Sequence, residues 1–102
     1  MELICDLKET EWMMESDDYV DRFIGEYIQT KIRYMKLHNM CIKYEAGTLP
    51  FTPKCPLELL KEQKAHMGNY LRVLEIRAEI EKIKLPDNAL ISMGNSVKEG
   101  DE

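Results

Sequence analysis

The aromatic and basic side chains between residues 19 and 44 are the ones most capable of chemistry in this 102-residue chain. The tyrosines Tyr19, Tyr27, Tyr34 and Tyr44 are interleaved with the basic residues Lys31, Arg33, Lys36 and Lys43. A tyrosine ring can stack on a nucleobase, and a lysine or arginine can pair with a phosphate. The same tyrosines would equally suit a protein core or a subunit interface with their hydroxyls at its rim. The spacing alone leaves both interpretations open.

Residues suited to catalysis are few. A nucleophilic pair such as Cys55 with His66 is conceivable, but the sequence neither places the two together nor shows an oxyanion loop. HExxH, CxxC and glycine-rich phosphate-binding motifs are all absent from the sequence. The three cysteines, Cys5, Cys41 and Cys55, form an odd set without metal-ligand spacing, which favours a reduced, cytosolic chain. We therefore expect a binding protein that is not an enzyme and needs no metal or cofactor.

The charge distribution limits the choice of partner. The net charge is −5, yet residues 17–84 carry twelve Lys or Arg against ten Asp or Glu, so a mildly basic body lies between two acidic ends. Long nucleic acid needs a row of phosphate contacts, and this small excess of cations does not predict one. A small anion needs only two or three cations and remains possible. No apolar run approaches the ~20 residues that span a bilayer, and residues 1–16 lack the basic start of a secretory signal.

Two long helical patterns organise the chain, over residues 17–46 and 57–84. Ser16 or Asp17 is the expected N-cap of the first helix, and Gly47 is the expected left-handed residue after its end. The loop is rich in proline, and Pro56 is expected in the first turn of the second helix, with Thr52 or Cys55 near its cap. Gly68, inside that helix, suggests a close approach by another part of the chain. We expect an all-α fold, an antiparallel helical hairpin over residues 17–84.

Two further segments flank the hairpin. Residues 1–16 form an acidic segment that could contain a short helix or a strand. Residues 85–102 are polar and acidic and are expected to be a disordered tail.

Both helices have more apolar surface than a two-helix hairpin can bury. In the first helix, a row containing Phe23 and Tyr27 lies beside a second row of Ile24, Ile28, Met35 and Ile42. In the second helix, Tyr70, Val73, Ile76 and Ile80 lie mostly outside the row expected to close the hairpin, whereas Glu75, Glu79 and Glu81 suggest ordinary ion pairing along a solvated face. Exposed apolar rows of this extent mark interaction sites. They predict a homo-oligomer.

Two stretches resemble a family of small helical phage proteins that includes the anti-CBASS sponges. RFIGEYIQTKIRYMKL (residues 22–37) looks like the first helix of that family, and LLKEQKAHMGNYLRVLEIR (residues 59–77) looks like its second-helix pattern of Leu-Leu, Gln, Met, Tyr and Leu-x-x-Arg. The resemblance implies a compact helical hexamer in the cytoplasm of an infected bacterial host. It also implies an anti-defence function, in which cyclic di- or trinucleotide immune messengers are sequestered and not cleaved.

The resemblance also implies ligand-binding positions. A helix-one aromatic that stacks on a base matches Tyr27, and a lysine near the end of that helix matches Lys43. A loop threonine and a helix-two arginine of a separate cyclic-trinucleotide pocket match Thr48 and Arg77. The acidic start, the loop from Gly47 to Pro56 and the acidic tail depart from the family pattern. A second hypothesis is a phage inhibitor or adaptor, comparable to an anti-CRISPR protein, that acts by protein–protein contact through its acidic ends.

Overall fold

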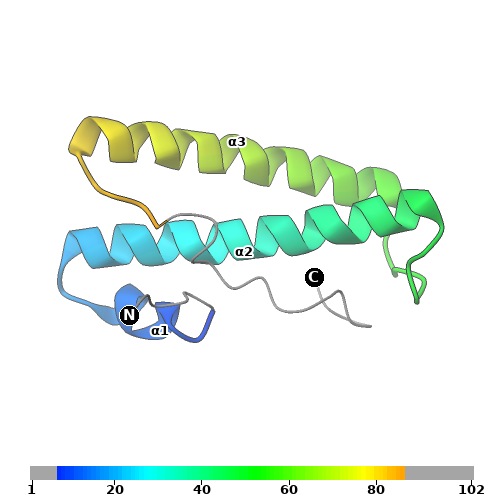
Figure 1. Ribbon diagram of the computed structural model, residues 1–102, viewed down its shortest axis with the longest axis horizontal. Coiled ribbons are helices and arrows are strands. Elements are labelled where there is room, and N and C mark those ends of the chain that lie inside the picture. The colour runs from blue at the N-terminus through cyan, green and yellow to red at the C-terminus, as the bar shows by residue number, and fades with distance from the viewer. Residues whose placement is uncertain (1–6, 87–102) are drawn as a thin grey trace.

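The computed structural model describes residues 7–86, and this part of the chain contains three helices and no strand. Helix α1 spans Thr10–Glu15, α2 spans Tyr19–Ala46 and α3 spans Leu57–Glu81. The two long helices run antiparallel, and α1 packs on α2 on the side away from α3 (Figure 1). The all-α prediction is confirmed. The tail expected over residues 85–102 lies outside the described residues from residue 87 onward, as do residues 1–6 of the acidic segment.

The ends of α2 follow from local hydrogen bonding. Its N-cap is Asp18, whose carboxylate accepts from the Val20 N–H at 3.0 Å, so the prediction of Ser16 or Asp17 was wrong by one or two residues. Ser16 has a different role, because its hydroxyl accepts from the Asp18 N–H and donates to Asp21. At the other end Gly47 adopts the predicted left-handed conformation, with φ 77°.

The ends of α3 differ from the sequence-based expectation. Pro56 is itself the N-cap and not a first-turn residue, and no side chain caps this end. The helix stops at Glu81, three residues before the predicted Lys84, because Lys82 takes a left-handed conformation with φ 59°. The Ile83 N–H then bonds to the Ala78 carbonyl at 2.9 Å, which closes the last turn. This turn carries Ile83 and Leu85 back to the core.

The core consists of two clusters along the α2–α3 interface. The larger contains Phe23, Tyr27, Ile28, Ile32, Leu71, Leu74 and Ala78, and the smaller contains Leu37, Met40, Cys41 and Leu60. Between them the ring of Tyr34 lies 3.2 Å from where a β-carbon on Gly68 would stand, which confirms the close approach expected at this glycine. The interior glycine of α3 therefore makes room for an aromatic side chain.

The second apolar row of α2 is only partly available to another chain. Ile28 is fully buried and Ile24 is half-buried, because Met13 of α1 and the turn at Ile83 and Leu85 pack against the same cluster. The prediction that this row faces solvent was therefore wrong for its first half. The row on α3 differs, since Tyr70, Val73, Ile76 and Ile80 are all exposed in the single chain.

Helix α1 is fastened to α2 by specific contacts. Gln29 donates to the Thr10 hydroxyl at 2.9 Å, and that hydroxyl donates to the Leu7 carbonyl at 2.6 Å. Arg22 donates to the Ser16 carbonyl at 2.7 Å. Gly25 lies beneath α1, and a β-carbon added there would stand 2.8 Å from Cβ of Met13. The part of residues 1–16 that the structure describes is thus a docked helix and not a strand.

Candidate functional site

Tyr27 lies in the larger core cluster, and its hydroxyl bonds to a side chain of α3. Its side chain is 4% exposed, and its hydroxyl donates to Oε2 of Glu75 on α3 at 2.8 Å. Nζ of Lys31, one turn along α2, lies 3.9 Å from the same carboxylate oxygen. Burial, aided by the hydrogen bond to Glu75, raises the pKa of Tyr27 well above its usual value near 10. The ring therefore offers no free face for stacking in this arrangement, and the core interpretation describes its position.

Tyr27 is one of the residues that line an open recess. The recess measures about 540 Å³ and lies between α2, α3 and the turn that follows α3. Its polar lining comes from Tyr27, Lys31, Glu75, Glu79 and Lys84, and its apolar wall from Ala78, Ile83, Leu85 and Pro86. Two cations and two carboxylates thus face one volume, which lies within the size range of small-molecule sites. The arrangement can bind a ligand that carries both an anionic group and hydrogen-bond donors.

Sequence reasoning overlooked Glu75, Lys31 and Lys84 as neighbours in this recess. The glutamates of α3 were expected to pair along their own helix, and Arg77 with Glu81 does so at 3.3 Å. Glu75 instead bonds across the hairpin to Tyr27. Only the register between the antiparallel helices could have identified this contact, and residue spacing within one helix does not supply it.

Arg77 is engaged in an intramolecular cluster where α2 begins and α3 ends. Its guanidinium donates to the Tyr19 hydroxyl and lies 5.0 Å from the centre of the Phe23 ring. The Tyr19 hydroxyl in turn donates to Glu81 at 2.9 Å. These contacts join the two helix ends and occupy the side chain that the resemblance assigned to a ligand.

Lys43 and Thr48 lie at the other end of the hairpin. The Thr48 N–H bonds to the Lys43 carbonyl at 2.9 Å as part of the turn that closes α2. A smaller recess of about 180 Å³ lies beside them, and aromatic side chains of Tyr44 and Phe51 are among its lining. Neither Lys43 nor Thr48 is among the residues that line it.

The four predicted ligand residues do not converge within one protomer. Tyr27 and Lys43 are sixteen residues apart on one helix, or about 24 Å along its axis at 1.5 Å per residue. Arg77 contacts the first residue of α2 whereas Thr48 follows its last, so roughly 40 Å separates these two. A small ligand cannot touch both members of either pair in a single chain.

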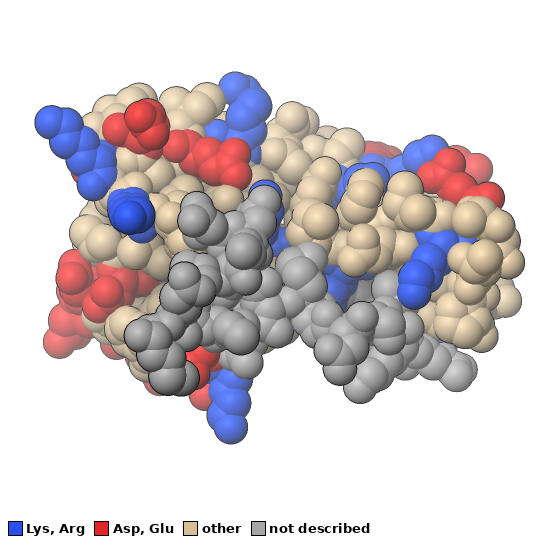
Figure 2. All heavy atoms as spheres, in the orientation of Figure 1, with Lys and Arg blue, Asp and Glu red and all other residues tan. Residues whose placement is uncertain are grey.

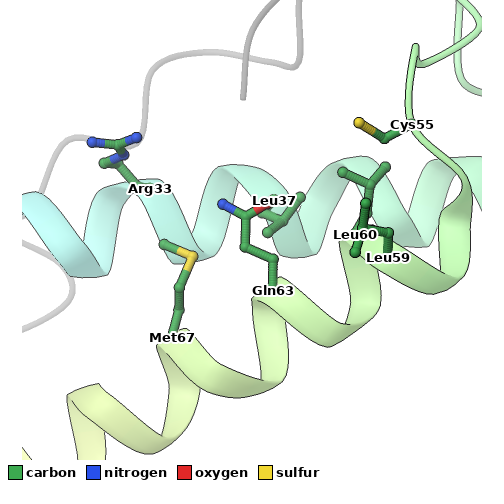
Figure 3. A pocket seen from close by; sticks show the side chains of 7 residues that line it. All are labelled: Arg33, Leu37, Cys55, Leu59, Leu60, Gln63 and Met67. Carbon is green, nitrogen blue, oxygen red and sulfur yellow. The ribbon is translucent and has the colours of Figure 1, made fainter.

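A third recess, of about 270 Å³, lies between α2, α3 and the loop that precedes α3 (Figure 3). Leu37, Leu60 and Met67 form apolar parts of its lining, whereas Arg33 and Gln63 supply its polar groups. Cys55 borders it, but the structure shows no hydrogen bond between Cys55 and His66 in residues 7–86. His66 lies 3.7 Å from Glu62 on its own helix. The conceived Cys–His pair therefore has no geometric support.

The surface charges and ligand-forming groups are dispersed. Acidic and basic side chains intermingle on the face shown in Figure 2, with acids gathered near α1. Within the described part of the chain, no group of three or more His, Cys, Asp or Glu side chains could hold a metal ion. Between residues 7 and 86, no helix is long and apolar enough to cross a membrane.

Comparison with known proteins assigns most of the hairpin to one family. The family described as Sequestin matches residues 17–80, which include all of α2 and all of α3 except Glu81. No curated protein and no solved structure matches the chain. Helix α1 precedes the matched region, and the turn at Ile83 follows it. Because the match covers more than half of the chain, this protein belongs to the Sequestin family.

Proposed function

We propose that this protein is a phage-encoded sponge that binds cyclic oligonucleotide immune messengers in the cytoplasm of an infected bacterium and does not cleave them. Membership of the Sequestin family is the observation that carries the proposal, since it favours retention of a ligand over its turnover. The open recess at Tyr27 supports it with a physical site.

The recess suits a nucleotide in three respects. Lys31 and Lys84 supply positive charge for a phosphate, and a charge-assisted hydrogen bond to either contributes about 1.5–3 kcal/mol. Ala78, Ile83 and Leu85 offer an apolar wall for the plane of a base. The Tyr27 hydroxyl, already oriented by Glu75, contributes an edge contact in place of the stacking first expected.

Assembly would complete the site. Tyr27 and Lys43 can contact one ligand only if they come from different protomers, and the same holds for Thr48 and Arg77. The exposed row of α3, Tyr70, Val73, Ile76 and Ile80, lies within about 120° of the helix surface at 100° per residue, so it can pack against a second copy. We therefore extend the proposal to a homo-oligomer, hexameric by resemblance, with ligand sites shared between protomers.

Calorimetric titration with cyclic di- and trinucleotides tests the proposal. Lys31→Gln and Lys43→Gln should each weaken binding about tenfold or more, since the loss of 1.4 kcal/mol is a factor of ten. Lys8→Gln is the control, because Lys8 is exposed just before α1, on the side of α2 away from α3, and does not line the recess. Absence of binding to every cyclic nucleotide would refute the sponge.

A protein–protein inhibitor is the second candidate, favoured by the same exposed row on α3. It requires that this row bind a foreign protein and that the recess remain without a nucleotide. A monomeric mass by light scattering, together with no binding of cyclic nucleotides, would favour it over the sponge.

A further inference from the structure

The carboxylate of Glu75 is anchored through one oxygen and open at the other. Oε2 accepts from the Tyr27 hydroxyl at 2.8 Å and lies 3.9 Å from Nζ of Lys31. Oε1 has no hydrogen bond to any described residue, and the side chain is 46% exposed beside the recess. Each carboxylate oxygen offers about two lone pairs, so Oε2 can accept a second hydrogen bond. Glu75 therefore presents two acceptors, held in place from the protein side.

We propose that Glu75 reads the base of the bound ligand and selects guanine over adenine. This inference rests on the proposed function, since it concerns the ligand of the same recess. The Watson–Crick edge of guanine presents two adjacent donors, N1–H and the N2 amino group, which match the two oxygens of an ionised carboxylate. Adenine presents one amino donor beside the N1 acceptor, and that lone pair would face a carboxylate oxygen. Proteins commonly read unpaired bases by hydrogen bonds to this edge.

The surroundings of Glu75 fit the rest of a nucleotide whose base contacts this carboxylate. The apolar wall of Ala78, Ile83 and Leu85 can cover the base plane while Lys31 and Lys84 remain beside the phosphate. The donor edge of the base then lies against the Glu75 carboxylate, and the phosphate lies beside the two lysine ammonium groups. The recess contains equal numbers of Lys and Glu, and this polarity is complementary to both parts of the ligand.

Glu79 is the other carboxylate in the recess that could accept hydrogen bonds from the base. It lies one turn after Glu75 and lines the same volume. No hydrogen bond or ion pair joins it to another described residue, so its carboxylate lacks the anchor that Tyr27 gives to Glu75. An unanchored glutamate loses more side-chain freedom on binding, which makes it the weaker discriminator.

Calorimetric titration with cyclic di-GMP, cyclic di-AMP and cyclic di-IMP tests the inference. Each good bidentate contact typically discriminates by about tenfold or more, so the wild-type protein should prefer cyclic di-GMP to cyclic di-AMP by that factor. Inosine keeps N1–H and lacks the N2 amino group, so cyclic di-IMP should bind with intermediate affinity. Glu75→Gln replaces one acceptor with a donor, a pattern that also suits adenine, and should reduce the preference about tenfold.

Glu79→Gln is the charge-matched control. It removes the same negative charge from the same recess, so it should change the affinity for all three ligands by one factor and keep the guanine preference. Equal wild-type affinity for cyclic di-GMP and cyclic di-AMP would overturn the inference and leave the sponge intact. Loss of preference in Glu79→Gln and not in Glu75→Gln would overturn the assignment to Glu75. Failure of all three cyclic dinucleotides to bind would also overturn the inference, and failure of cyclic trinucleotides as well would refute the proposed function.

Discussion

Replacing Gly25 with alanine should test how α1 packs on α2, because the added β-carbon would displace α1 and leave the α2–α3 contacts unchanged. The new β-carbon would stand 2.8 Å from Cβ of Met13 and 3.1 Å from the Met14 sulfur. The sulfur can rotate away, but Cβ of Met13 is fixed to the backbone, so α1 itself must move. Overpacking of this kind costs about 1–3 kcal/mol. The gain in helix propensity from Gly to Ala offsets about 1 kcal/mol of that cost.

We therefore expect Gly25→Ala to lower the free energy of unfolding by about 1 kcal/mol, or the melting temperature by about 4–8 °C. In a Met13→Gly background the rigid obstacle is gone, and the same change should stabilise the protein by about 1 kcal/mol. Urea unfolding of the four proteins measures both values, and amide exchange over residues 10–15 reports whether α1 has undocked. The cost cannot exceed the free energy of docking, because undocking relieves the clash.

Gly68→Ala is the matched control. Its β-carbon would meet the edge of the Tyr34 ring at 3.2 Å, and a ring can yield by a few tenths of an ångström where a backbone cannot. The expected change in stability is therefore smaller than at Gly25 and independent of Met13. If Gly25→Ala stabilises the protein equally in both backgrounds, α1 does not pack on Gly25 and the description of this contact is wrong.

Three further predictions concern Tyr27, Arg77 and the apolar row of α3. Because the pKa of Tyr27 is raised in the folded protein, the unfolded chain loses its proton first as pH increases. Stability should therefore fall above about pH 10, and the fall should be smaller in Tyr27→Phe. Arg77→Ala should lower the melting temperature by a few degrees, because exposed ion pairs and cation–π contacts contribute roughly 1 kcal/mol or less each; an unchanged melting temperature would show that the Tyr19–Arg77 cluster does not hold the helix ends. Val73→Asp and Ile80→Asp should each dissociate the oligomer in light scattering, since they bury an unpaired charge, whereas Arg72→Asp should not; a wild-type protein that is already monomeric would exclude this interface.

The hairpin was predictable because its signals are local. The apolar periodicity of α2 and α3 and the left-handed Gly47 each act within a few residues of the chain. The end of α3 was not predictable in the same way, since Lys82 adopts a conformation that favours glycine and is held there by the packing of Ile83. Tertiary contacts decided this boundary.

Which residues line the site depends still more on contacts between residues that are far apart in the sequence. Tyr27 stood out in the sequence as an aromatic residue among cations, but its burial and its bond to Glu75 depend on how α3 is aligned with α2. The turn that brings Lys84 to the recess follows from the unexpected end of α3. Packing of Met13 and Met14 onto the hairpin was one possibility that the sequence left open, but it did not identify Gly25 as the contact point, because a glycine beneath two methionines has no distinctive spacing.

The proposed sponge would hold its ligand and return it unchanged. The most direct measurement is stoichiometric loading with a cyclic dinucleotide, followed by removal of free ligand, heat denaturation and chromatography of what is released. A sponge should release the intact cyclic dinucleotide in a fixed ratio to protein, even after prolonged incubation. Release of a linear or hydrolysed nucleotide would contradict sequestration and indicate an enzyme.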